Sequence, residues 1–236
     1  EMARCITFSA DGGTIFYSRQ GRSGHSLLMA SLTYSGDAFR VGRETLIADN
    51  RVGQDLVEDP APFPDGRMIV FHRKVDPQSG AAVAVINLDG SGLQALTASD
   101  GCGHAVVSPD GNTIACSRSK DGRVVLIRRA AGQWLAPEDL PLSTRPSDYS
   151  GMDKRFARVR EVRHSYLEWI APDMLLLTSH GADGAKEFRM ARLFLLRLHP
   201  AGRLPEVLDL SSPIEILVGR SGRDFCSAAG ILSTGR

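Results

Sequence analysis

A short apolar segment that runs into the same tight turn recurs five times along this chain. The turns occupy residues 9–12, 63–66, 108–111, 171–174 and 232–235, and the last two depart from the pattern of the first three. A unit that repeats at a long period cannot bury its own apolar faces, so such units stack against their neighbours. The recurrence therefore predicts a repeat architecture, and it leaves the ligand or partner open.

The third copy shows why these residues suit the turn. The Ser108 hydroxyl can accept a local backbone hydrogen bond, and Pro109 fixes φ near the value that the second position of a type I turn requires. Gly111 supplies the left-handed residue that ends a three-residue hairpin loop. Met174 stands at that place in the fourth copy, where a positive φ would strain it. We therefore expect the fourth turn to differ in type.

Each turn is followed by β-favouring segments that are joined by short polar loops. In the second copy, residues 69–71 and 83–86 are entirely apolar, as expected of sheets that are packed on both faces. Four antiparallel strands per repeating unit describe the blade of a β-propeller. The sequence thus predicts an all-β fold, a β-propeller of four-stranded antiparallel blades, with four recognisable blades plus the first strand of a fifth.

The chain is expected to be a single propeller domain or a fragment of one. The blades are expected at about residues 3–57, 58–100, 101–140 and 164–212, with an insertion at 141–163 and the start of another blade at 224–236. An incomplete ring would expose a sheet edge, which isolated proteins avoid. We therefore expect a part of a larger propeller, completed by other segments of the protein or by other subunits.

Charge and hydropathy argue against two classes of partner. The 28 Lys and Arg residues balance the 27 Asp and Glu residues, so there is no global attraction to nucleic acid or to an anionic membrane. No uninterrupted apolar run approaches the ~20 residues of a membrane helix, so no membrane span is expected. The first residues show no signal segment, and a leader or upstream domain outside this sequence stays an open alternative.

The four cysteines, Cys5, Cys102, Cys116 and Cys226, form no CxxC motif. Their spacing argues against a thioredoxin-like site, a zinc ribbon and c-type haem attachment. Cys102 and Cys226 occupy matching places in their repeats, and such places in different blades are too far apart for a disulfide unless the blades adjoin. Buried or half-buried free thiols are therefore expected.

Two stretches resemble the TolB-type propeller repeat, which reads roughly SPDGxxIAF, then an apolar strand, then (N/D)xDG. They are residues 108–115 and residues 64–71 continued by 84–90. The resemblance covers most of residues 3–129 and, more weakly, 164–236. TolB is a periplasmic bacterial propeller that binds partner proteins, and similar repeats occur in prolyl-oligopeptidase-like peptidases and in some carbohydrate lyases. The resemblance implies a propeller fold, and it alone favours a periplasmic or secreted location.

Three arginines share a register position near the end of the second strand of their blades: Arg19, Arg73 and Arg118. They are expected to form an arc on one rim, where guanidinium groups could clamp carboxylates or phosphates through paired hydrogen bonds. The alternative is that each pairs with an acidic side chain or a loop carbonyl of the adjoining blade, since repetition also copies structural pairs. We predict the three as candidate binding residues, with that alternative open.

His164 and His180, with Glu168 and Asp173, are weak candidates for a metal site, because some lyases with similar propellers use several histidines around a divalent ion. No HxH or HxxxH spacing supports such a site. We therefore expect no metal and no cofactor.

The sequence contains no GxSxG elbow, no HExxH and no GxxxxGK(S/T) loop, so no catalytic residue is predicted. We predict a non-catalytic TolB-like propeller that binds a protein or peptide through one rim. The alternative is an accessory propeller domain of a larger enzyme, either a prolyl-oligopeptidase-like peptidase or a polysaccharide-lyase-like enzyme. A fold that serves many functions does not choose between the two.

Overall fold

The computed structural model describes residues 2–21, 24–49, 56–74, 80–98, 101–149, 154, 158–182, 191–199 and 205–209 of the 236-residue chain. These residues form four antiparallel sheets in chain order, and the 3₁₀ turn η1 (Pro146–Asp148) lies between the third and the fourth. In the described part of the chain, no helix is long and apolar enough to cross a membrane.

The first two sheets each contain four strands in sequential order. The first consists of β1 (Met2–Phe8), β2 (Thr14–Gly21), β3 (Gly24–Ser35) and β4 (Ala38–Asp49). The second consists of β5 (Leu56–Pro62), β6 (Met68–Lys74), β7 (Ala82–Asn87) and β8 (Gln94–Ala95).

The third and fourth sheets repeat this order, except that two short strands share the outer position of the third. The third consists of β9 (Cys102–Val107), β10 (Thr113–Arg118) and β11 (Arg123–Ala130), against which β12 (Gln133–Trp134) and β13 (Glu138–Asp139) both pair. The fourth consists of β14 (Glu161–Ala171), β15 (Met174–Ala182), β16 (Ala191–Arg197) and β17 (Glu206–Asp209).

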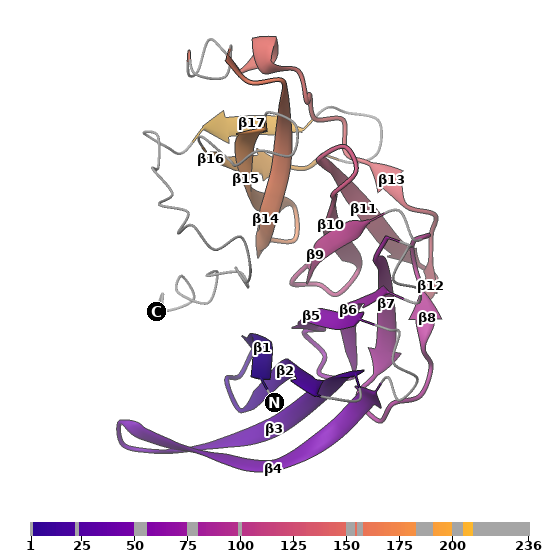
Figure 1. Ribbon diagram of the computed structural model, residues 1–236, viewed down its shortest axis with the longest axis vertical. Helices are drawn as coiled ribbons and strands as arrows, with labels where there is room; N and C mark the ends of the chain where they lie inside the picture. Colours follow the sequence, from indigo (N-terminus) through magenta and orange to yellow (C-terminus); the bar gives the residue numbers. More distant parts are fainter. Residues whose placement is uncertain are drawn as a thin grey trace.

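The four sheets stand face to face in a fan, with β1, β5, β9 and β14 toward a common centre (Figure 1). Three apolar clusters fill the spaces between neighbouring sheets. Between the first and second sheets, for example, Phe16 and Leu27 pack with Ile69 and Phe71, all at most 2% exposed. Burying such a side chain fully stabilises the fold by about 1.5–3 kcal/mol. This is the architecture of a β-propeller, so the predicted fold class is confirmed.

The first three turns have the predicted construction. Gly12, Gly66 and Gly111 have φ values of 70°, 66° and 71°, and each donates its N–H to the carbonyl of the first turn residue. The turn aspartate accepts the N–H two residues further on; Asp110 Oδ1, for example, lies 3.0 Å from the Asn112 nitrogen. The Ser108 hydroxyl accepts the Thr113 N–H at 2.9 Å, as expected.

The fourth turn differs in type, as Met174 predicted. Ala171 and Met174 pair directly across the ladder, so only Pro172 and Asp173 connect the two strands. Met174 does not adopt a positive φ, because the shorter connection needs no left-handed residue at that place. The fifth turn, at 232–235, and the blade expected to start at 224 lie outside the described residues.

The cysteine prediction is confirmed at two positions and wrong at a third. Cys102 and Cys116 are free thiols in the core between the second and third sheets. Cys5 is disulfide-bonded. It is only half-buried and faces the centre of the fan rather than a packed core, so its sulfur is accessible for bonding. Cys226 lies outside the described residues.

Candidate functional site

Each inner strand of the fan contains a register shift at the same place, just after its first few residues. One residue in each shift has a positive φ: Cys5 (49°), Asp59 (49°), His104 (52°) and Tyr166 (51°). They are four of the five non-glycine residues with positive φ in the described chain. Such conformations cost of order 1–3 kcal/mol each. A strained bulge thus recurs in all four blades, and it re-aims one side chain in each.

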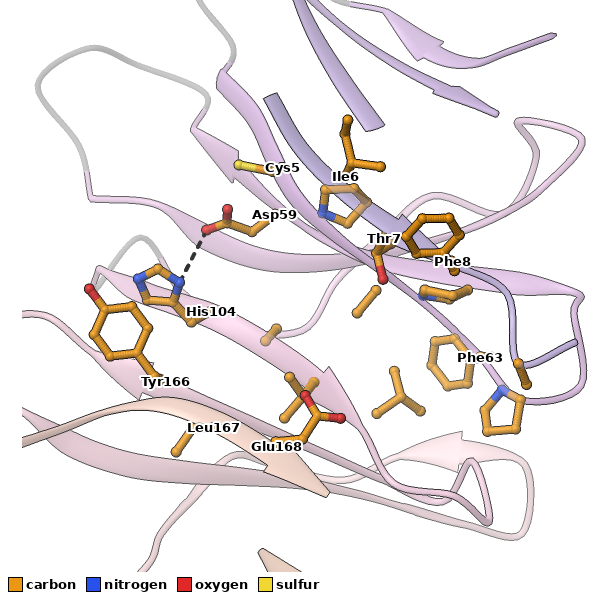
Figure 2. Close-up of a pocket in the computed structure, with 18 residues that line it drawn as sticks. Cys5, Ile6, Thr7, Phe8, Asp59, Phe63, His104, Tyr166, Leu167 and Glu168 are labelled. Atoms are coloured by element: carbon orange, nitrogen blue, oxygen red, sulfur yellow. Dashed lines mark ion pairs between the residues drawn. The ribbon is translucent and has the colours of Figure 1, made fainter. Parts of the chain in front are cut away.

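The four bulge residues line one pocket of about 230 Å³ at the centre of the fan, which we call the axial pocket (Figure 2). Its other described walls are mostly apolar. They include Ile6, Phe8, Pro60, Pro62, Phe63, Val106 and Leu167, with Glu168 as a further acidic residue. The inner strands of four separate blades therefore contribute different chemical groups to a single cavity.

Two histidines hold the Asp59 carboxylate at one side of the pocket. Asp59 Oδ2 lies 3.1 Å from His72 Nδ1 and 3.6 Å from His104 Nδ1. Burial alone would raise the pKa of Asp59, but the hydrogen bond from His72 and the electrostatic interactions with the two histidines, that of His104 being the smallest, lower it below its ordinary value. Asp59 is therefore ionised at neutral pH. His72 is almost fully buried, and its Nε2 has no hydrogen-bond partner in the described part of the structure.

The opposite wall of the pocket is formed by β14. The Tyr166 ring lies 5.3 Å from the His104 ring, and burial raises the pKa of its phenol. Burial also lowers the pKa of His104, so this imidazole tends to be neutral. The pKa of Glu168 is raised to about 7 by burial, without a described side chain that offsets it.

Cys5, His104 and Asp59 are the residue types of a cysteine hydrolase, and all three line the pocket. Nucleophilic catalysis needs a thiolate, and the Cys5 sulfur is engaged in a disulfide. Among the described residues there is also no group of three or more His, Cys, Asp or Glu side chains that could hold a metal ion. The arrangement suits reversible binding of a mixed polar and apolar group.

The three arginines of the predicted rim lie at equivalent register positions. Arg19 is opposite Ala3 on β1, Arg73 opposite Val57 on β5, and Arg118 opposite Cys102 on β9. Counting from the turn aspartate as in the other blades leads to Gly181 in the fourth blade. Because the fourth turn is shorter, the strand pairing places Ser179 at this register position instead. Counted from the bulge, Ser165 and Thr178 occupy the place of Gly103 and Ser117.

Two of these arginines form ion pairs within their own blade. Arg19 pairs with Glu44 and also donates to the Tyr17 hydroxyl at 3.1 Å. Arg118 bridges Asp121 and Asp139 with nitrogen–oxygen distances of 2.8 and 2.9 Å, and these hydrogen bonds raise the pKa of its guanidinium. These described acidic partners belong to the same blade as their arginine. Arg73 is half-buried. Whether the three bind a partner stays a prediction.

His164 and His180 lie on neighbouring strands but point to opposite faces of the fourth sheet. His164 pairs with Ser179 and Arg163 pairs with His180, and side chains alternate along a strand. His164 Nε2 donates to the Ser143 carbonyl at 3.0 Å, and Nδ1 contacts the Ser179 hydroxyl at 2.7 Å. The structure therefore does not bring the two imidazoles together, and the described contacts of His164 are structural.

The axial pocket was not predicted from the sequence, although a signal for it exists. Cys5, Asp59 and His104 each stand six residues before their turn aspartate, and Tyr166 stands seven before Asp173. Comparing the residues that precede each turn would have identified these four residues. Comparing the residues that follow each turn identifies the three arginines instead.

No family model matches the sequence, and no curated protein sequence matches it. Solved structures do match. TolB from Acinetobacter baumannii has a TM-score of 0.57 at 12% identity, over 90% of this chain and 44% of that chain. A puromycin-hydrolyzing peptidase from Mycobacterium tuberculosis has a TM-score of 0.56 at 13% identity, over 89% of this chain and 29% of that chain.

An oligogalacturonate lyase from Vibrio parahaemolyticus is similar to the same degree, with a TM-score of 0.57 at 11% identity over 88% of this chain and 54% of that chain. The chain therefore spans about half of the TolB and lyase structures, and less than a third of the peptidase. At these identities the likeness shows the fold alone, and that fold is a TolB-like β-propeller.

Proposed function

We propose that this propeller binds a segment of a partner protein at the axial pocket. The observation that carries the proposal is the recurrence of a left-handed, non-glycine residue at the same bulge of four inner strands, all lining one cavity. Strain of this kind persists where the surrounding structure enforces it, and it clusters at binding and catalytic sites. Because Cys5 is disulfide-bonded, binding is the function that these groups support best.

Two exposed apolar side chains at the pocket support a partner rather than a small polar ligand. Ile6 and Phe8 line the pocket and remain 55% and 51% exposed. Large apolar side chains grouped at a cavity are the usual anchors of protein interfaces. A bound segment would cover both of them. The alternative of an accessory propeller in a peptidase or a lyase rests on fold likeness alone.

The arginine arc belongs to the same proposal. Arg19 and Arg118 pair with residues of β1 and β9 that precede Cys5 and His104 by two positions. The rim is therefore adjacent to one end of the axial pocket. A partner carboxylate could replace Asp139 or Glu44 as the acceptor of the guanidinium hydrogen bonds.

Site-specific crosslinking tests the location. A photoreactive phenylalanine placed at Tyr166, which lines the pocket from β14, should capture a partner from an extract of the native source at low salt. The same group at Leu135, which is 48% exposed on the outer side of the third sheet, should capture far less. Equal capture at the two positions, or none at Tyr166, would contradict binding at the pocket.

We also propose that a further antiparallel sheet covers the outer face of the first sheet, as in a larger propeller. Leu27 and Met29 on β3 pack toward the second sheet, so Leu28, Ala30, Leu32 and Tyr34 face the other way. The cross-strand neighbours Phe8, Phe39, Val41 and Leu46 belong to that outer face through the ladder. Tyr34, Phe39, Val41 and Leu46 are 45–62% exposed. Exposed apolar patches of this kind mark interaction sites.

Hydroxyl-radical footprinting distinguishes a covered face from a free one. Tyr34 and Phe39 should be oxidised readily in the 236-residue chain and protected in the protein isolated from its native source. Ile170 is 51% exposed on a different sheet and serves as an internal reference. Equal oxidation of Tyr34 and Phe39 in both preparations would contradict this second proposal.

A further inference from the structure

The described charged residues that line the axial pocket are mostly acidic. The described residues that line it include two carboxylates, Asp59 and Glu168, and no lysine or arginine. His104 is the only described basic group in the wall, and its burial favours the neutral imidazole. A ligand that enters this space therefore meets acidic side chains, and no described lysine or arginine lies beside them.

The two carboxylates differ in how they are satisfied. Asp59 is held by His72 and His104. The Glu168 carboxylate has no hydrogen-bond or ion-pair partner among the described residues, and burial alone shifts its protonation. Figure 2 shows its oxygens directed from β14 toward the pocket. A half-buried carboxylate without a partner is unfavourable, and a cation placed beside it removes that penalty.

The size and walls of the pocket limit the shape of such a cation. About 230 Å³ is less than the ~300 Å³ at which pockets for drug-sized ligands begin, so the space suits one side chain. Its apolar walls, including Phe8, Phe63 and Val106, suit an alkyl stem. Lysine and arginine combine an apolar stem with a charged head in this way.

We propose that the axial pocket takes a lysine or arginine side chain of the bound partner, with its ammonium or guanidinium group beside Glu168. The inference rests on the proposed function and specifies which part of the partner enters the pocket. A terminal amine would offer the same charge on a shorter stem. The experiment therefore includes it as a separate arm.

The test compares short peptides that differ at one position. The probes are acetyl-Ala-Leu-X-Leu-Ala-amide with X as Lys, Arg or Gln, and the Gln peptide with a free amino terminus. Dissociation constants come from NMR titration of the 236-residue chain at pH 8 and low salt. The Lys or Arg peptide should bind about tenfold more tightly than the acetylated Gln peptide, as for one charge-assisted hydrogen bond.

Glu168→Gln should reduce that preference to about onefold, because it keeps the size of the side chain and removes its charge. Asp37→Asn changes the net charge equally at the exposed β3–β4 turn and should keep the preference. Equal binding of the Lys, Arg and Gln peptides, a preference that survives Glu168→Gln, or no binding at all would overturn the inference. A gain only with the free amino terminus would assign the site to a terminal amine instead. Crosslinking at Tyr166 decides the proposed function independently of all these results.

Discussion

Asp59 Oδ2 accepts a hydrogen bond from His72 Nδ1 at 3.1 Å, which joins an inner strand to its neighbour beside the axis of the fan. Asp59 lies in the bulge of β5, and its left-handed backbone directs the carboxylate to this contact. His72 lies on β6, where it is almost fully buried. The pair therefore ties the strained backbone of the axial pocket to the core of the second sheet.

Replacing Asp59 by Asn should lower the free energy of unfolding by about 1–3 kcal/mol, because a buried, charge-assisted hydrogen bond to His72 is lost. Urea denaturation at pH 7.5 measures the change. Asp37→Asn, at the exposed turn between β3 and β4, should stay within about 0.5 kcal/mol of the wild type. A D59N variant as stable as the wild type would show that the contact with His72 contributes nothing.

Stability should fall as the pH drops below about 6.5, because two buried histidines are neutral in the folded protein. Burial lowers the pKa of His164 to about 4 and that of His180 to about 3. As the pH falls, the two histidines bind protons in the unfolded chain before they do so in the folded protein. Their contribution to the free energy of unfolding is therefore full above the unfolded pKa of about 6.5, and it is lost as the pH falls toward the pKa values of the folded protein. For His164 the loss is on the order of 3 kcal/mol.

Denaturation curves between pH 7.5 and 4.5 give the slope of stability with pH. A His164→Gln variant removes one of the two buried imidazoles and should reduce the slope. A flat profile for the wild type would contradict buried, neutral imidazoles at His164 and His180.

Glu168 should have the opposite effect to the two histidines, because its contribution to stability increases as the pH falls. Burial raises its pKa to about 7, so the folded protein holds a proton that the unfolded chain has already released. The contribution of Glu168 to the free energy of unfolding is fully present below about pH 4.5 and is lost as the pH rises through 7. Glu168→Gln should therefore be more stable than the wild type at pH 8, and the difference should vanish at pH 4. Equal stability of the two proteins at both pH values would show that Glu168 is solvated.

The fold could be predicted because its determinants are local in the sequence. The segment 108–111 specifies its own hairpin through a proline, a capping aspartate and a left-handed glycine, and the apolar runs beside it have the length of strands. Met174 also predicted which of the four described turns differs in type. Four repetitions of such a unit leave little choice but sheets that stack around an axis.

The four residues of the site share a sequence position before the turns, but the backbone conformation that brings them together could not be predicted, because its determinants are not local. Nothing in the residue types Cys5, Asp59, His104 and Tyr166 announces a left-handed backbone, which arises from register shifts against the neighbouring strand. The ion pairs of Arg118 with Asp121 and Asp139 likewise depend on how β11 and β13 return to the end of β10. Only the folded chain places these groups together.

Thiol labelling checks the assignment of the cysteines. Cys102 and Cys116 are 0% exposed, so both should react with a maleimide only when the protein unfolds. Cys5 should stay unlabelled even in urea until a reductant is added, because it is disulfide-bonded. Mass spectrometry of the labelled peptides gives the result for each cysteine. Labelling of Cys5 in unreduced, unfolded protein would contradict the disulfide.

Changing Arg19, Arg73 and Arg118 together to Ala should weaken partner binding more than folding, if the rim contacts the partner. Arg19 and Arg118 sit in half-exposed ion pairs with Glu44 and Asp139, and pairs of this kind contribute about 0–1 kcal/mol to stability. A bound partner would exclude water from the rim, so the hydrogen bonds between its carboxylate and the guanidinium groups would be stronger than the exposed ion pairs. Capture through the crosslinker at Tyr166, normalised to folded protein, measures binding, and the thermal midpoint measures folding. A collapsed midpoint with unchanged capture per folded molecule would show the three arginines to be structural.

The single variant Arg123→Ala controls for the loss of charge at that end of the third sheet. It removes a more exposed guanidinium from the same cluster, which contains Asp121 and Asp139.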